Sequence, residues 1–394
     1  MFKHLFKLMW NKRKHNFLFL SEILVSFMVI FAISSFLIYY FQNYSKERGL
    51  DYEKVWSVSY DESYKTKNSD SLTMYYENLK NVIKALPEVE EVSFSSNNIP
   101  YANSISTTSI TFKGKSFDGI NQYLVGEGYK KVWNMNLEEG RWFTKEDEVA
   151  KDRPIVINET LKRDLFGDQS AVGKSTADYE GNKKLKIIGV VQDFKANGDF
   201  QPSGRAMFWK VDTAAFRWLN SLLIKVGPKA DAAFESRLYK LISNTMKNSS
   251  IEITHVSELR ISKNEATVMP MIIFSIIAGF LILNVALGLF GVLWYNINKR
   301  KGEIGLRRAI GASGSSVSLQ LVAESFVLAS MSLIVGVFFA LQFPLLGVYN
   351  VPSAVYLTAI LLSVGFIYVL VILCALYPGK QAAAILPAVA LHEE

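Results

Sequence analysis

The chain has 394 residues, 50% of them apolar, and its mean hydropathy is +0.16. Because the apolar residues gather in long blocks, the composition excludes a single soluble domain. The formal net charge of +7 does not indicate nucleic-acid binding, because the basic residues cluster beside the apolar blocks. The single cysteine, Cys374, excludes an intrachain disulfide and a Cys-based metal site.

The amino-terminal segment combines a basic amphipathic stretch with an apolar run. Residues 1–16 are predicted to lie at the cytoplasmic interface, because they contain five basic residues and no acid: Lys3, Lys7, Lys12, Arg13 and Lys14. Residues 17–41 carry one charge, Glu22. At about 1.5 Å per residue this run crosses a hydrocarbon core of about 30 Å. We expect a permanent first transmembrane helix, since neither the short apolar centre nor the cleavage site of a secretory signal is evident.

Residues 42–266 form a polar insertion that we expect to be an extracytoplasmic α+β domain with its own core. At each end the sequence predicts a strand, a helix and a second strand. The first set lies at 54–60, 70–86 and 89–95, and the second set lies at 221–226, 228–247 and 251–256. Two such units predict a ferredoxin-like β-α-β subdomain over about 50–100 and 216–258. Between them a β-rich subdomain is predicted over about 101–215, with strands near 106–112, 154–158, 184–191 and 205–211 and a helix over 159–166.

Three further apolar runs follow, at 268–297, 317–343 and 355–377, and residues 378–394 form a tail. The polar stretch 257–267 lacks strong helix breakers, so the second of the four predicted transmembrane helices can continue outward. Ser313, Ser315 and Ser316 are candidate caps of the third. The fourth is expected to end at Pro378. With four spans, both termini lie in the cytoplasm.

Residues 298–314, between the second and third spans, form a basic segment punctuated by glycines. Its positive charge predicts a cytoplasmic location. Glu303 and Arg307 stand in the favourable i,i+4 order of a helix, whereas each glycine costs an isolated helix up to about 1 kcal/mol. A helix here therefore needs something to dock against. Gln320 and Glu324, one turn apart in the third span, are expected to contact it.

The run Arg300-Lys-Gly-Glu-Ile-Gly-Leu-Arg-Arg-Ala-Ile-Gly-Ala-Ser313, followed by Gln320 and Glu324, resembles the signature after the second span of MacB-like and FtsX-like ABC-transporter permeases. The insertion carries further strings in that family's order. They are Leu137-Glu-Glu-Gly-Arg-Trp-Phe143, which looks like the family's turn, Ile155-Val-Ile-Asn-Glu159, Leu165-Phe-Gly167, Val172-Gly-Lys174 and Ile188-Gly-Val-Val-Gln-Asp-Phe194. The resemblance covers nearly the whole chain.

The resemblance implies a bacterial inner-membrane permease subunit that transmits the motion of a cytoplasmic ABC ATPase to a periplasmic domain. The implied ATPase-coupling residues are Arg300, Glu303, Ile304, Gly305, Arg307, Arg308 and Gly311. ATP and Mg²⁺ are expected in the partner subunit and no cofactor in this chain. Further implied partners are a second permease copy or paralogue, membrane lipids, and in some systems a periplasmic adaptor and an outer-membrane duct.

Several functions stay open within this class. The implied substrates are peptides, antibiotics or lipoproteins, exported or acted on by mechanotransmission. One alternative is an FtsX-like activator of a cell-wall hydrolase or a lipoprotein-releasing permease. An alternative of another class is a membrane sensor with an extracytoplasmic ligand-binding domain.

No catalytic or metal-binding residue is predicted. The stretch from Gly167 to Ser175 resembles a phosphate-binding loop, but five residues instead of four separate its first glycine from Gly-Lys. It also lies in the exported domain. The histidines do not pair at metal-ligand spacing: His4, His15, His255 and His392. The acids of probable turns are expected to be solvated or to cap helices: Glu146, Asp147 and Asp193.

Overall fold

The computed structural model describes residues 17–61, 68–178, 184–212, 219–247 and 249–384. The chain divides into two compact units, one of residues 1–42 with 269–394 and one of residues 43–268. The predicted amphipathic start at 1–16 and the end of the tail, 385–394, lie outside the described residues.

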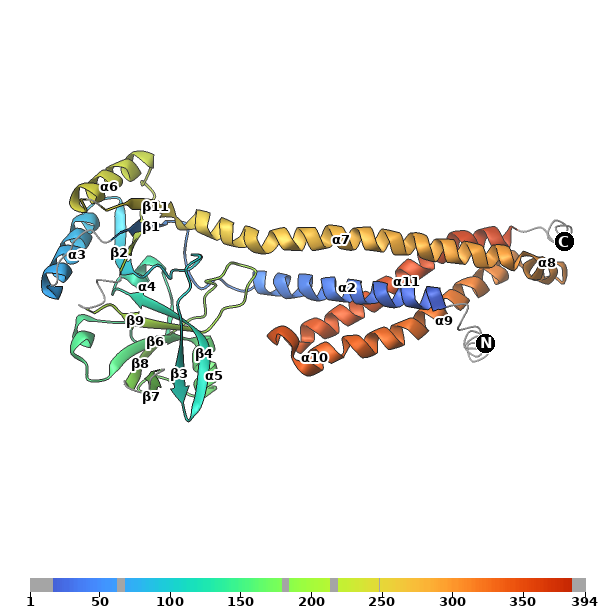
Figure 1. Cartoon of the computed structure of the whole chain (residues 1–394), viewed down its shortest axis with the longest axis horizontal. Coiled ribbons are helices and arrows are strands. Elements are labelled where there is room, and N and C mark those ends of the chain that lie inside the picture. The colour runs from blue at the N-terminus through green and yellow to red at the C-terminus, as the bar shows by residue number, and fades with distance from the viewer. Residues whose placement is uncertain (1–16, 62–67, 179–183, 213–218, 248, 385–394) are drawn as a thin grey trace. The chain divides into compact units, whose positions relative to one another are not determined.

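The unit 43–268 contains the predicted ferredoxin-like subdomain (Figure 1). Its elements are β1 (Val55–Tyr60), α3 (Ser69–Lys84), β2 (Val89–Ser95), β10 (Ser221–Val226), α6 (Ala232–Thr245) and β11 (Ile251–His255). The strands lie in the order β11-β1-β10-β2, and neighbours are antiparallel. Tyr76 and Leu79 of α3 and Leu238 of α6 share one buried core with the strands. The predicted β-α-β repeat and its fold are therefore confirmed.

The β-rich part is a closed barrel that the sequence did not predict. Its strands are β3 (Thr107–Phe112), β4 (Lys115–Val125), β6 (Arg153–Asn158), β7 (Ser175–Asp178), β8 (Lys184–Val191) and β9 (Ala206–Lys210). They pair in the order β4-β3-β7-β8-β6-β9, and β9 pairs in parallel with β4 to close the ring. Closure leaves these strands without a free edge. A short strand, β5 (Leu137–Gly140), pairs with β8.

The barrel and the ferredoxin-like subdomain share a second hydrophobic core. Tyr123 stacks on Phe208 with ring centroids 5.2 Å apart, and Trp142 meets Phe208 edge-on at 5.4 Å. Leu223 of β10 and Val256, the first residue of the helix that follows β11, belong to the same buried cluster. The sheets also join directly, because β2 pairs with β4 through Ser95 and Val125. The two subdomains therefore behave as one packed body.

Several predictions within this unit are corrected. Helix α6 begins at Ala232 rather than at Pro228, because the Asp231 carboxylate accepts the Phe234 N–H at 2.8 Å and caps it. Residues Leu137–Gly140, which begin the string described as the family's turn, form strand β5. Strands β4, β5 and β7 were not predicted, nor were the short helices α4 (Tyr129–Val132) and η1 (Lys145–Val149).

Other predictions are confirmed. Helix α5 (Glu159–Phe166) has the predicted bounds. Asp193 accepts the Thr160 N–H at 2.8 Å at the start of α5, and Asp147 accepts the Thr144 N–H at 2.8 Å at the start of η1, so both acids act at helix ends. The loop after Gly167 runs from α5 into β7, the reverse of the strand-loop-helix order of a phosphate-binding loop.

Within the residues that the structure describes, four helices are long and apolar enough to cross a membrane. They are α2 (Phe17–Tyr44), α7 (Val256–Lys299), α9 (Gly314–Ala340), which continues into α10 (Gln342–Leu346), and α11 (Ser353–Ala383). A short turn, η3 (Val348–Asn350), precedes α11. Helix α7 includes the polar stretch 257–267, as expected. Helix α11 does not end at Pro378 but continues to Ala383, and Gly379 lets it approach α9, because a Cβ there would lie 2.7 Å from Ser318 Oγ.

The ion pair of Asp147 gives a prediction on acid stability. Arg141 donates to both carboxylate oxygens, at 2.7 and 2.6 Å, and thereby lowers the pKa of Asp147. A carboxyl with a lowered folded pKa stabilises the fold above its unfolded pKa of about 3.9, and loses that contribution as pH falls through the folded pKa. We expect Asp147→Asn to lower the free energy of unfolding at pH 7 by about 1–3 kcal/mol and to flatten its loss in acid.

Urea unfolding of the full chain in detergent, followed by tryptophan fluorescence between pH 7 and pH 2, measures both effects. The exposed Asp168, replaced by Asn, is the control. An equal acid sensitivity of Asp147→Asn and wild type would contradict this account.

Candidate functional site

The segment between α7 and α9 folds as a short helix, α8 (Lys301–Ala309). Arg300 stands before its first turn, and Arg307 and Arg308 lie in its last turn, where positive charge suits the helix dipole. Gly311 follows with φ +105°, a left-handed conformation that favours glycine. Ser313 then caps α9 by accepting the Ser316 N–H at 3.2 Å, so the first of the three predicted cap serines is used.

Arg300 joins α8 to α9 through two carboxylates. Its Nε donates to Glu303 Oε2 at 3.0 Å, and its Nη1 donates to Glu324 Oε2 at 2.7 Å. The Glu303 carboxylate, and after it that of Glu324, raises the pKa of the Arg300 guanidinium above its ordinary value. Glu324 is only 8% exposed, so loss of this partner would leave a buried carboxylate without its ion pair.

Arg307 extends the same network along α8. Its Nη2 donates to Glu303 Oε1 at 2.6 Å, which confirms the predicted i,i+4 pair, and its Nη1 donates to Gln320 Oε1 at 2.8 Å. Gln320 in turn donates to Glu324 Oε1 at 2.9 Å. The expected contact of Gln320 and Glu324 with the basic segment is therefore confirmed. We call these five residues, Arg300, Glu303, Arg307, Gln320 and Glu324, the α8 charge network.

The two faces of α8 differ. Ile304 is 4% exposed and packs in a cluster with Ile297, Val317 and Ala382, while Gly305 beside it is also buried. Arg308 donates to the Ala383 carbonyl at the end of α11. Leu306 and Ile310, four residues apart, are 52% and 79% exposed. Sequence reasoning missed these two, because periodicity shows that an apolar pair shares a face but not which face is covered.

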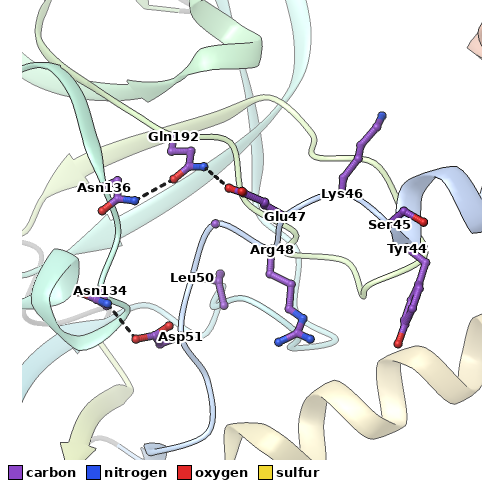
Figure 2. Close-up of a pocket in the computed structure, with 11 residues that line it drawn as sticks. Tyr44, Ser45, Lys46, Glu47, Arg48, Leu50, Asp51, Asn134, Asn136 and Gln192 are labelled. Atoms are coloured by element: carbon purple, nitrogen blue, oxygen red, sulfur yellow. Dashed lines mark hydrogen bonds between the residues drawn. The ribbon is translucent and has the colours of Figure 1, made fainter.

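A polar cavity of about 450 Å³ lies in the other unit, along the segment that leaves α2 (Figure 2). Figure 2 shows that Gln192 bridges its wall: Asn136 donates to Gln192 at 3.1 Å, and Gln192 donates to Glu47 at 3.1 Å. Asn134 donates to Asp51 at 2.9 Å nearby. Among the residues that the structure describes, no cluster of three His, Cys, Asp or Glu could hold a metal ion.

Fold and site together define a class of membrane protein: four apolar helices, an α+β domain inserted after the first, and a short charged helix between the second and third. The model of the MacB-like periplasmic core domain matches residues 18–240, and that of the FtsX-like permease C-terminal domain matches residues 275–387. The chain belongs to the MacB-like and FtsX-like family of ABC-transporter permeases.

Individual relatives agree with the family models. The macrolide export ATP-binding/permease protein MacB of Bdellovibrio bacteriovorus is 25% identical over 80% of this chain and 48% of its own length. The uncharacterized ABC transporter permease YknZ of Bacillus subtilis is 22% identical over 68% of this chain and 69% of its own. The chain thus spans about half the length of the MacB relative and more of YknZ.

Among solved structures, the periplasmic region of MacB from Actinobacillus actinomycetemcomitans aligns at 16% identity. The alignment covers 56% of this chain and 97% of that one, with a TM-score of 0.39. Because a TM-score below 0.5 does not establish a common fold, the fold is identified by its strand order and by the family models.

The α8 charge network predicts how α8 is held. Replacing Arg300 by Met removes the cation from the buried Glu324, and hydrogen bonds to charged groups contribute about 1.5–3 kcal/mol. We expect amide hydrogen exchange in residues 301–309 to rise at least about 10-fold. Mass spectrometry of the chain in lipid nanodiscs measures this, with the exposed Lys299→Met as the control. Unchanged exchange in Arg300→Met would show that apolar packing alone holds the helix.

Proposed function

We propose that this chain is the permease subunit of a MacB-like ABC system, and that α8 receives the motion of a cytoplasmic ATPase and passes it through α7 to the extracytoplasmic domain. The single observation that carries the proposal is the two-sided character of α8. One side is fixed to α9 and α11 by charge and apolar contacts, and the other presents Leu306 and Ile310 to solvent.

The bonds on the fixed side of α8 would let this helix pass a displacement on to its neighbours. Because Arg300 and Arg307 bond to side chains of α9, and Arg308 bonds to the end of α11, a push on α8 reaches its neighbours without first bending a loop. In this proposal Arg300, Glu303, Ile304, Gly305 and Gly311 position the helix. Leu306 and Ile310 make the contact with the ATPase, with Arg307 and Arg308 at its border.

ATP hydrolysis, with Mg²⁺, is assigned to a separate polypeptide. The relatives named MacB are described as ATP-binding/permease proteins, whereas the matched models are of a periplasmic core domain and a permease domain. The stretch of this chain closest to a phosphate-binding loop has the wrong spacing and the wrong order of elements. We further propose that the termini and α8 lie in the cytoplasm and that two permease copies, or this chain and a paralogue, act together.

The substrate is proposed from the relatives alone. Several are named for macrolide export, so macrolides are the first compounds to test with this chain. Peptides and lipoproteins are the next classes, and the proposal does not require an adaptor or an outer-membrane duct.

Removing the exposed apolar pair should weaken ATPase binding. Burying one large apolar side chain is worth about 1.5–3 kcal/mol, so Leu306→Ser together with Ile310→Ser should weaken the complex at least about 100-fold. Co-purification from native cells, with the retained protein identified by mass spectrometry and assayed for ATP hydrolysis, measures this. Leu345→Ser, at a side chain that is 77% exposed on α10, is the control. Retention of a histidine kinase in place of an ATPase would favour the sensor alternative.

The orientation of α8 is tested by labelling. In a Cys374→Ala background, which removes the chain's one native cysteine, a cysteine is placed at Ile310 or at Lys115 of β4. We expect a membrane-impermeant maleimide added to intact cells to label Lys115→Cys, and Ile310→Cys only after the cells are opened. Labelling of Ile310→Cys in intact cells would place α8 outside and refute the proposal.

A further inference from the structure

The loop between β8 and β9, residues 192–205, contacts two helix ends of the extracytoplasmic unit. One is the end of α2 at Tyr44 and the segment that follows it. The other is the first part of α7, which begins at Val256. These segments are far apart in sequence, and the loop between them carries two charged side chains that are almost completely buried, Lys195 and Asp199, each 1% exposed.

Lys195 binds the end of α2. Its ammonium donates to the carbonyls of Asn43 at 2.5 Å, Lys46 at 2.6 Å and Tyr44 at 3.3 Å. The last carbonyls of a helix have no partner within the helix and carry partial negative charge, so a cation is favourable there. Burial lowers the pKa of Lys195, and the nearby Asp199 opposes that effect. A backbone bond from Lys195 N to Arg48 O, at 2.9 Å, fixes the loop against the same segment.

Asp199 binds the beginning of α7. Its carboxylate accepts from Arg260, and from Asn264 Nδ2 at 3.1 Å, while its backbone N–H donates to Asn264 Oδ1 at 2.8 Å. Gly198, with φ +103°, permits this approach, because a Cβ there would lie 2.9 Å from Asn264 Oδ1. Arg48 Nε lies 3.9 Å from the other carboxylate oxygen, so the segment after α2 also faces Asp199.

The loop is itself anchored in the barrel's shared core. Phe194 is 2% exposed and lies 5.7 Å, centroid to centroid, from Phe208 of β9. Ala196 O accepts the Tyr101 N–H at 2.7 Å. The segment after α2 is also fastened along the polar cavity, where Glu47 accepts from Gln192 and Asp51 from Asn134 (Figure 2). The contacts of Lys195 and Asp199 thus continue into strands of the barrel.

We propose that Lys195 and Asp199 form a rigid joint through which motion of α2 and α7 is transmitted into the barrel. The joint rests on the proposed function, since it presumes that these helices move when ATP is hydrolysed. Lys195 and Asp199 are positioning residues: they touch no reacting group, and they fix two helix ends to one loop. Hydrogen bonds between buried charges and backbone carbonyls are directional, so they hold the two helix ends in one geometry against the loop.

The first measurement uses the full chain in nanodiscs. We expect Lys195→Met to raise amide hydrogen exchange in residues 43–48 at least 10-fold while exchange in β6 and β8 stays unchanged. Lys186→Met, which removes an exposed lysine from the adjacent strand β8, should change neither. Unchanged exchange in residues 43–48 of Lys195→Met would overturn the joint.

The second measurement follows transmission in the complex with the ATPase. Spin labels at Lys115→Cys on the barrel and Leu345→Cys on α10, in the Cys374→Ala background, report one distance by pulsed electron resonance with and without ATP and vanadate. We expect that distance to change in wild type and in Lys186→Met. In Lys195→Met the change should be lost while the ATPase remains bound and hydrolyses ATP.

The outcomes separate the two proposals. A wild-type distance change that persists in Lys195→Met overturns the joint and leaves the proposed function intact. No change in wild type overturns the proposed function and the joint with it. If Lys195→Met also loosens β6 and β8, Asp199→Asn replaces it, because that variant keeps the side-chain volume and removes the negative charge that faces Arg260, Asn264 and Arg48. A distance change that Asp199→Asn retains in full then overturns the joint.

Discussion

The salt bridge between Arg300 and Glu324 is the contact on which the proposed coupling site depends. Helix α8 has nine residues and two internal glycines, so its own hydrogen bonds cannot keep it folded in water. Glu324, nearly buried in the apolar helix α9, equally needs a cation. Each element supplies what the other lacks, and Glu303, Arg307 and Gln320 connect Arg300 to Glu324 by a second chain of hydrogen bonds. The rigidity of the site is thus a property of the assembled helices.

A related arrangement recurs where the extracytoplasmic unit begins. Lys195 binds the last carbonyls of α2, as Arg308 binds the Ala383 carbonyl at the end of α11. In both places a positive side chain from another element occupies the negative end of a long helix. Helix α7 is a single helix from Val256 to Lys299, with Arg260 in its first turns and Arg300 directly after it.

Local patterns in the sequence predicted much of the fold. The two strand-helix-strand units were recognisable because apolar alternation is a property of neighbouring residues, and the pair of Glu303 and Arg307 because it depends on helical spacing alone. Strand β4 escaped prediction because its first half, from Lys115 to Gly119, is mostly polar and exposed and contains a glycine. Barrel closure joins Asn121 to Ala206 in parallel, and no local pattern encodes that pairing.

The candidate site, too, could be predicted from the sequence only in part. Basic charge and glycine spacing indicated where α8 lies, but the burial of Ile304 and the exposure of Leu306 depend on how α9 and α11 pack. The contacts of Lys195 and Asp199 join residues that lie even farther apart in the sequence. Lys195 meets carbonyls about 150 positions earlier in the chain, so nothing near it in the sequence signals its role.

The barrel interrupts the ferredoxin-like sheet in the sequence, so the two halves of that sheet come from distant parts of the chain. Strand β1 pairs with β10, so Ser59 has its partner, Ser221, about 160 residues later in the chain. A free chain of that length loses considerable entropy on closure, and such distant pairings form slowly. The barrel's strands all lie between β2 and β10, so a barrel that forms first brings the two halves of the sheet together. A folded barrel therefore lowers the entropy cost of pairing β1 with β10.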